Sequence, residues 1–192
     1  MRRKYYLYSG LLAILAEWAG FVLIAYFHHL DLNKALSVNT VASWPLPLIF
    51  GITLTLAGLG YGLFSVALKP YAHSIIYVGI TAGVAFAFTG WTPYTGYGGV
   101  GDLVHQAFSY VALAGYITMV WLLRSHPKRQ IRLASKIIVG LMLAIIALAP
   151  VSNYVWHQGF GYLQIAIVGL FQSWVVLVVW QERKLTAMDK IA

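Results

Sequence analysis

Six long apolar segments alternate with short polar ones along the 192-residue chain. A helix needs about 20 mostly apolar residues to cross the hydrocarbon core of a bilayer, and six windows meet this requirement. The apolar runs are continuous, whereas the strands of an outer-membrane barrel would alternate with period two. The pattern therefore predicts an all-α, polytopic bundle of six transmembrane helices that forms a single domain over residues 1–192. The windows are 5–27, 46–68, 71–90, 103–123, 132–149 and 160–180.

Composition and charge agree with a membrane protein and predict its orientation. The chain is 60% hydrophobic and 9% charged, whereas charged residues make up roughly a quarter of an ordinary soluble domain. The net charge of +8 comes from Lys and Arg residues that flank the apolar segments, so we expect no nucleic-acid partner. With the N-terminus in the cytoplasm, every Lys and Arg except Lys34 falls on the cytoplasmic side, as the positive-inside rule requires. We expect a multi-pass protein of the cell membrane with both termini cytoplasmic.

Polar residues gather at one depth, where three predicted helices reach the outer side of the membrane. His28 ends the first helix, Asp102 and His105 open the fourth, and His157 precedes the sixth. Asp102 and His105 are three residues apart and therefore project from one helix face. Together with Trp91, the residues Asp102, His105 and His157 predict a shallow pocket at the outer face. We expect this pocket to bind a membrane lipid or a small amphiphile.

The same residues support other chemistry. The chain contains no cysteine, and histidines with a carboxylate are what a zinc site uses when thiolates are absent. In a metal-dependent lipid hydrolase at the outer leaflet, His105, His157 and His28 would hold zinc and Asp102 would orient a ligand or the attacking water. Haem bound between His105 and His157 is disfavoured, because a second haem near the inner face would have only His73 as a ligand. In a purely structural interpretation, Asp102 is the N-cap of helix four and His105 hydrogen-bonds to a neighbouring loop.

Glu17 is the one carboxylate deep inside a predicted span. Such a group is costly in lipid and by default faces the bundle interior with a partner. No Lys or Arg lies at its depth, so we expect its partners to be hydroxyl and amide groups. This leaves two hypotheses open: a structural hydrogen bond, or a proton-coupled carrier that uses Glu17. The expected partners are Ser65, Thr53, Thr55, Gln172 and Ser173.

Small residues predict close contact between the second and third helices, which a short turn joins as an antiparallel hairpin. Glycines recur on both segments, and glycine lets helix backbones approach each other in lipid. We therefore interpret these glycines as packing residues. They are Gly58, Gly60 and Gly62 on the second helix, and Gly79 and Gly83 on the third.

Two segments resemble a known family. Gly90-Trp-Thr-Pro93-Tyr-Thr-Gly, followed by Asp102-Leu-Val-His105, is similar to a motif of DUF998, a family of small prokaryotic multi-pass membrane proteins. The stretch from Gly159 to Gln164 is similar to the last helix of that family. The chain departs from the family pattern at Thr95, where an acidic residue is usual, and at Ile165, where a basic one is usual. The resemblance implies the topology and a role for His105, but no established activity; a homo-oligomer is compatible with it.

Overall fold

The computed structural model is mostly helical and has no strand in the part of the chain that it describes, which confirms the all-α prediction. The helices are α1 (Arg2–Phe27), α2 (Leu46–Ala67), α3 (Ile75–Trp91), α4 (Val100–Leu122), the 3₁₀ turn η2 (Leu123–Ser125), α5 (Arg129–Val151) and α6 (Phe160–Met188). The described residues are 2–28, 45–92, 94, 99–151 and 160–188.

Each predicted apolar segment corresponds to one helix. Five helices are long and apolar enough to cross a membrane, and α3 is a shorter apolar helix of 17 residues. The predicted start of the third helix at residue 71 is wrong, because residues 68–74 form turns and α3 begins at Ile75. Pro70 accounts for the end of α2, since its ring prevents that helix from continuing and restricts the residue before it. The structure is that of a helical membrane bundle.

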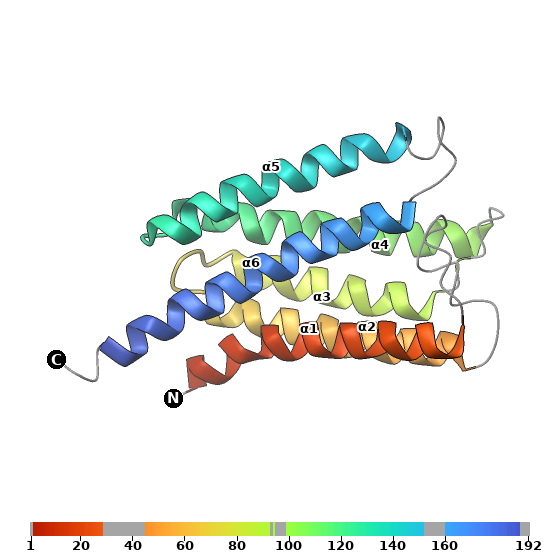
Figure 1. Ribbon diagram of the computed structural model, residues 1–192, viewed down its shortest axis with the longest axis horizontal. Helices are drawn as coiled ribbons and strands as arrows, with labels where there is room; N and C mark the ends of the chain where they lie inside the picture. The colour runs from red at the N-terminus through yellow and green to blue at the C-terminus, as the bar shows by residue number, and fades with distance from the viewer. Residues whose placement is uncertain (1, 29–44, 93, 95–98, 152–159, 189–192) are drawn as a thin grey trace.

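The helices run along one long axis, and both ends of the chain lie at the same end of the bundle (Figure 1). The helices from α1 to α4 pack closely, each against the next in the chain, whereas α5 and α6 make looser contact with the others. That looser contact leaves room inside the bundle between α5, α6 and the remaining helices.

The closest approach between helices is at the glycines of α2 and α3. A Cβ atom added at Gly58 would collide with the carbonyl oxygen of Gly83, and one added at Gly83 would collide with that of Gly58. A Cβ at Gly79 would meet the side chain of Ser65 on α2. Glycine is therefore required here for the two backbones to touch, as the packing interpretation predicted for Gly58, Gly79 and Gly83. The prediction of contact with α3 is wrong for Gly60, which packs against α1, and Gly62 has no tight contact.

Apolar and polar side chains are distributed between the surface and the interior of the bundle as in a protein surrounded by lipid. Large apolar side chains such as Leu15, Leu59 and Leu141 are exposed on the outside of three different helices. Polar side chains, among them Glu17 and Gln172, are buried inside. Lipid is as apolar as these exposed side chains, so the polar residues are the ones that face the bundle interior.

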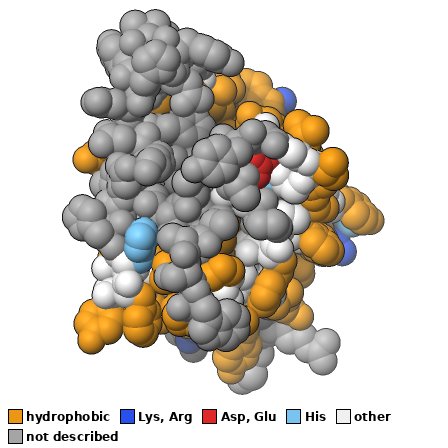
Figure 2. All heavy atoms as spheres, turned by 90° about the vertical axis from the view of Figure 1, so that its right-hand side faces the viewer, with side chains coloured by type: hydrophobic (Ala, Val, Ile, Leu, Met, Phe, Trp, Pro, Cys, Tyr) orange, Lys and Arg blue, Asp and Glu red, His pale blue; other side chains and the backbone are white. Residues whose placement is uncertain are grey.

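The two ends of the bundle differ in charge. The end with the chain termini also carries the turn after α2 with Lys69 and the connection from α4 to α5 with Arg124 and Lys128 (Figure 1). Figure 2 looks onto the opposite end, where hydrophobic side chains surround the rim and few Lys or Arg side chains are visible among the described residues. This asymmetry agrees with the expected orientation, which stays a prediction.

Candidate functional site: a central cavity

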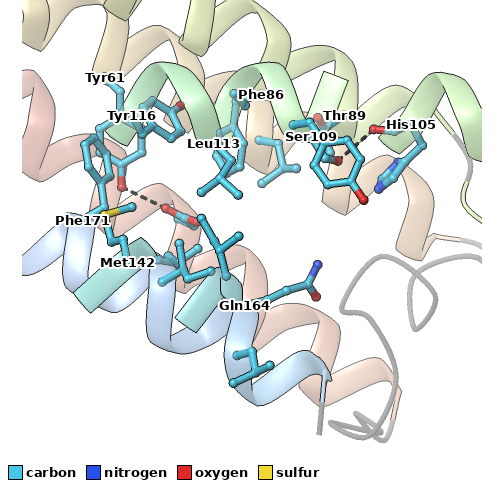
Figure 3. A pocket seen from close by; sticks show the side chains of 18 of the residues that line it. Tyr61, Phe86, Thr89, His105, Ser109, Leu113, Tyr116, Met142, Gln164 and Phe171 are labelled. Carbon is cyan, nitrogen blue, oxygen red and sulfur yellow. Dashed lines mark hydrogen bonds between the residues drawn. The ribbon is translucent and has the colours of Figure 1, made fainter. Parts of the chain in front are cut away.

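A cavity of about 510 Å³ lies inside the bundle. This volume falls within the range of roughly 300–1,000 Å³ that is typical of small-molecule sites. Most of the lining is apolar, and polar side chains occur at two separate levels (Figure 3). All the helices from α1 to α6 contribute, for example through Phe21, Leu54, Phe86, Leu113, Met142 and Ile167.

Glu17 marks the deep level, which we call the Glu17 end of the cavity. The side chain of Glu17 is only 1% exposed. The Tyr61 hydroxyl donates a hydrogen bond of 2.9 Å to its Oε2 atom, and the Gln172 amide donates another of 2.9 Å to the same atom. The indole of Trp18 donates to Oε1 of Gln172 at 2.8 Å, which fixes the amide with its nitrogen toward Glu17. Three helices thus hold one carboxyl group in place.

The partners of Glu17 only partly match those that the sequence predicted. Gln172 is confirmed as a partner, but Ser65, Thr55 and Ser173 donate their hydroxyl hydrogens to backbone carbonyls of their own helices. Tyr61 was missed. The available signal was a tyrosine in the middle of a helix otherwise rich in small residues.

Aromatic rings gather at the Glu17 end. The Tyr61 ring meets Tyr116 and Phe171 edge to face, with centroids 5.4 and 5.0 Å apart. Tyr116 stacks on Phe171 at 4.5 Å and meets Phe86 edge to face at 5.6 Å. The Tyr116 hydroxyl is buried and has no hydrogen-bond partner within the described residues. All four rings line the cavity.

His105 marks the other level, the His105 end of the cavity, together with Thr89, Ser109 and Gln164 (Figure 3). The Nδ1 atom of His105 lies 2.8 Å from the carbonyl oxygen of Thr92, just after α3. A carbonyl only accepts hydrogen bonds, so Nδ1 carries the hydrogen and Nε2 is the acceptor of the neutral ring. The predicted hydrogen bond from His105 to a neighbouring loop is therefore confirmed.

The other predicted pocket residues lie in different places. Asp102 is buried in the first turn of α4, where the helix dipole favours a negative charge. The N-cap is Gly99, so the prediction that Asp102 caps the helix is wrong. Trp91 is 53% exposed and donates its indole hydrogen to Thr55 on α2, and it is absent from the described cavity lining.

The zinc and haem hypotheses require His105 to lie near other histidines. His105 lines the cavity, whereas His28 follows the last residue of α1. Within the described residues, no group of three or more His, Cys, Asp or Glu side chains gathers as a metal site. His157 lies outside the described residues, so the zinc and haem hypotheses stay predictions.

A second buried carboxylate lies at the end of the bundle that holds the chain termini. Glu182 on α6 forms a 2.8 Å ion pair with Arg3 and accepts a hydrogen bond from the Tyr71 hydroxyl. Its Oε1 atom lies 3.4 Å from Lys128 Nζ and 3.6 Å from His126 Nε2. We call these five residues the Glu182 cluster. The cluster joins α1 and α6 to the α2–α3 turn, which holds Tyr71, and to the α4–α5 turn, which holds His126 and Lys128. The sequence analysis did not predict it.

Burial changes the titration of two members of the Glu182 cluster. Burial lowers the pKa of His126 below its ordinary value of 6.5, although the nearby Glu182 opposes this shift. The backbone N–H of Lys128 donates to Nδ1 of His126 at 3.1 Å, which also requires that nitrogen to be unprotonated. Burial, followed by the hydrogen bond to Glu182, raises the pKa of Tyr71. His126 and Tyr71 are therefore both held neutral beside Glu182.

No family model, curated protein or solved structure matches this chain. The resemblance to DUF998 stays a prediction, and function is argued below from the geometry of the cavity.

Proposed function

We propose that this multi-pass membrane protein binds a lipid or another small amphiphile in its central cavity. The observation that carries the proposal is the cavity itself, which is about 510 Å³ in volume and lined by all the helices from α1 to α6. Its middle is apolar, and polar groups occur at the Glu17 end and the His105 end. An amphiphile has an apolar body that matches the middle of the cavity and a polar group that matches one of its ends.

Water is a poorer match for the middle of this cavity. A buried water molecule needs two to four polar partners, whereas side chains such as Leu54, Leu113 and Ile167 offer none. Transfer of an apolar chain from water to these residues is favourable by about 0.8 kcal/mol for each methylene. A chain that enters from the bilayer gains no such energy, because lipid is equally apolar. The apolar part of the ligand would lie here, with its polar group at one of the two polar levels.

The orientation belongs to the same proposal. The basic residues at the termini end support a cytoplasmic location for both termini in the cell membrane. The His105 end would then lie nearer the outer leaflet and the Glu17 end deeper in the bilayer. The predicted outer pocket with Asp102 and His157 would form the entrance to the cavity.

Two alanines on α5 provide a matched test. Ala149 lines the cavity, whereas Ala147 is exposed on the outside of the same helix. Phenylalanine at position 149 fills cavity volume, and phenylalanine at position 147 adds the same group to the lipid-facing surface. We expect native mass spectrometry to find a copurified amphiphile on the wild type and on Ala147→Phe. Ala149→Phe should retain about a tenth as much, and equal retention by both variants would contradict the proposal.

A proton-coupled carrier that uses Glu17 is the second candidate. It is favoured by one observation, the presence of this buried carboxyl group in the lining of the cavity. Because Glu17 is buried, the uptake and release of a proton by its carboxyl group depend on what occupies the cavity. Uptake of the copurified amphiphile into sealed vesicles that contain the protein separates the two candidates. Binding without uptake supports the first candidate. Uptake that is lost in Glu17→Gln supports the second.

A further inference from the structure

The charge of Glu17 is not balanced by any basic group at its own end of the cavity. The described lining contains no Lys or Arg, and its one histidine, His105, lies at the opposite end (Figure 3). The two groups that hold Glu17, the Tyr61 hydroxyl and the Gln172 amide, are neutral donors. An ionised carboxylate in this position would therefore gain most from a cationic ligand.

Hydrogen-bonding capacity at this end is also incompletely used. Both donors reach Oε2 of Glu17, so neither of these bonds occupies Oε1. The Tyr116 hydroxyl is buried without a partner within the described residues, although Tyr116 is 93% buried and lines the cavity. A hydroxyl oxygen can accept a hydrogen bond as well as donate one. Two oxygens at the Glu17 end can thus accept a further hydrogen bond from a ligand with several N–H donors, and the Tyr116 hydroxyl becomes accessible to it when that side chain moves.

The aromatic rings favour the same kind of ligand. Tyr61, Tyr116, Phe171 and Phe86 surround this end of the cavity. The face of an aromatic ring carries negative charge density and attracts an ammonium group, more strongly where water is excluded. An anionic head group would instead meet repulsion from Glu17.

We propose that the Glu17 end recognises a protonated amine, so that the ligand of the cavity is a lipophilic alkylammonium ion. This inference rests on the proposed function, because it specifies the chemistry of the amphiphile in the same cavity. The ammonium group donates hydrogen bonds to Glu17 and Tyr116, and the apolar body of the ligand extends toward the His105 end.

Phenylbutylamine and phenylbutanol test the proposal, since they share an apolar body and differ in the charge of the polar group at pH 7. Equilibrium dialysis of the full chain in nanodiscs, corrected for empty nanodiscs, measures both affinities. We expect the wild type to bind the amine about tenfold more tightly than the alcohol. Glu17→Gln should reduce amine affinity to that of the alcohol and change alcohol affinity less than about twofold. Glu17→Asp, which keeps the charge, should retain a preference for the amine.

The outcomes separate this inference from the proposed function. If the wild type binds both probes equally and Glu17→Gln changes neither affinity, the amine inference is overturned while amphiphile binding stands. If neither probe binds to the wild type, both proposals fail. If Glu17→Gln lowers the melting temperature and loses both probes, Tyr116→Phe decides. That variant keeps the ring and the carboxylate, so a loss of about threefold for the amine alone supports the inference, and an unchanged affinity overturns it.

Discussion

Two buried carboxylates in this bundle have opposite surroundings. Glu182 is 4% exposed and Glu17 is 1% exposed, so both are removed from solvent. Two cationic side chains, Arg3 and Lys128, lie within 4 Å of Glu182, and His126 and Tyr71 are also neighbours of its carboxylate. Glu17 has two neutral donors and a cavity. The two carboxyl groups are therefore almost equally buried, but only Glu182 has cationic side chains of the described residues beside it.

The difference indicates different roles. Around Glu182, the chain itself supplies the positive charge, and the contacts join the N-terminal helix to the last one. Such a cluster fixes the arrangement of helices at one end of the bundle. Around Glu17, the chain supplies orientation but no positive charge, which leaves room for a ligand to supply it. Replacement of each residue by glutamine should therefore have different consequences.

Glu182→Gln should have the largest effect on stability. Glu182 is buried, but Arg3 is 49% exposed and can regain solvation, so the loss is that of the charged hydrogen bonds from Arg3 and Tyr71, about 1.5–3 kcal/mol. For a chain of this size, we expect the apparent melting temperature to fall by roughly 5–10 °C. Thermal unfolding in detergent, followed by tryptophan fluorescence, measures the change. A shift of less than about 2 °C would show that the cluster contributes little to the fold.

Glu17→Gln should have a much smaller effect on stability. The glutamine side-chain oxygen can accept the hydrogen bonds of Tyr61 and Gln172, and no positive charge within the described lining of the Glu17 end loses its partner. We expect the apparent melting temperature to stay within about 2 °C of the wild type, or to rise, in the same unfolding experiment. A decrease as large as that of Glu182→Gln would make Glu17 a structural residue and remove the contrast between the two sites.

The smallest expected effect is a pH dependence that originates from His126. The pKa of His126 is lower in the folded protein than its ordinary value of 6.5. As the pH falls below about 6.5, the unfolded chain therefore takes up a proton before the folded protein does, and stability decreases. Arg3, Lys128, Tyr71 and Glu182 also face this histidine.

The variant His126→Gln isolates this contribution. The melting temperatures of the wild type and the variant are measured between pH 8 and pH 5. We expect their difference to change by about 1–3 °C over this range. The wild type should lose more stability toward low pH. Parallel curves would show that His126 titrates in the folded protein as it does in the unfolded chain.

The sequence predicted the helices well because continuous apolar runs of sufficient length have few alternatives. It misplaced the start of α3, since the residues after Pro70 are apolar enough to continue the pattern but form turns. It also found Glu17 and one of its partners, Gln172. Depth in the membrane can be counted along a helix, so Glu17 and Gln172 on different helices could be considered together, and the structure confirms this pair.

Rotation about the helix axis was harder to predict. A helix that is apolar on all sides has no clear hydrophobic face, so the sequence did not indicate that Trp91 turns toward α2 or that Tyr61 turns toward Glu17. The Glu182 cluster was missed for another reason. It joins residues as far apart in sequence as Arg3 and Glu182, and only the packed helices bring them together.

An experimental density map of the full chain in lipid nanodiscs, at a resolution that shows side chains, would test the central claim most directly. We predict an elongated density inside the bundle that extends from His105 to Glu17, with its polar end beside Glu17 and Tyr116. A map in which α5 and α6 close against α4 and their side chains fill the space would contradict the proposal that the cavity is a binding site.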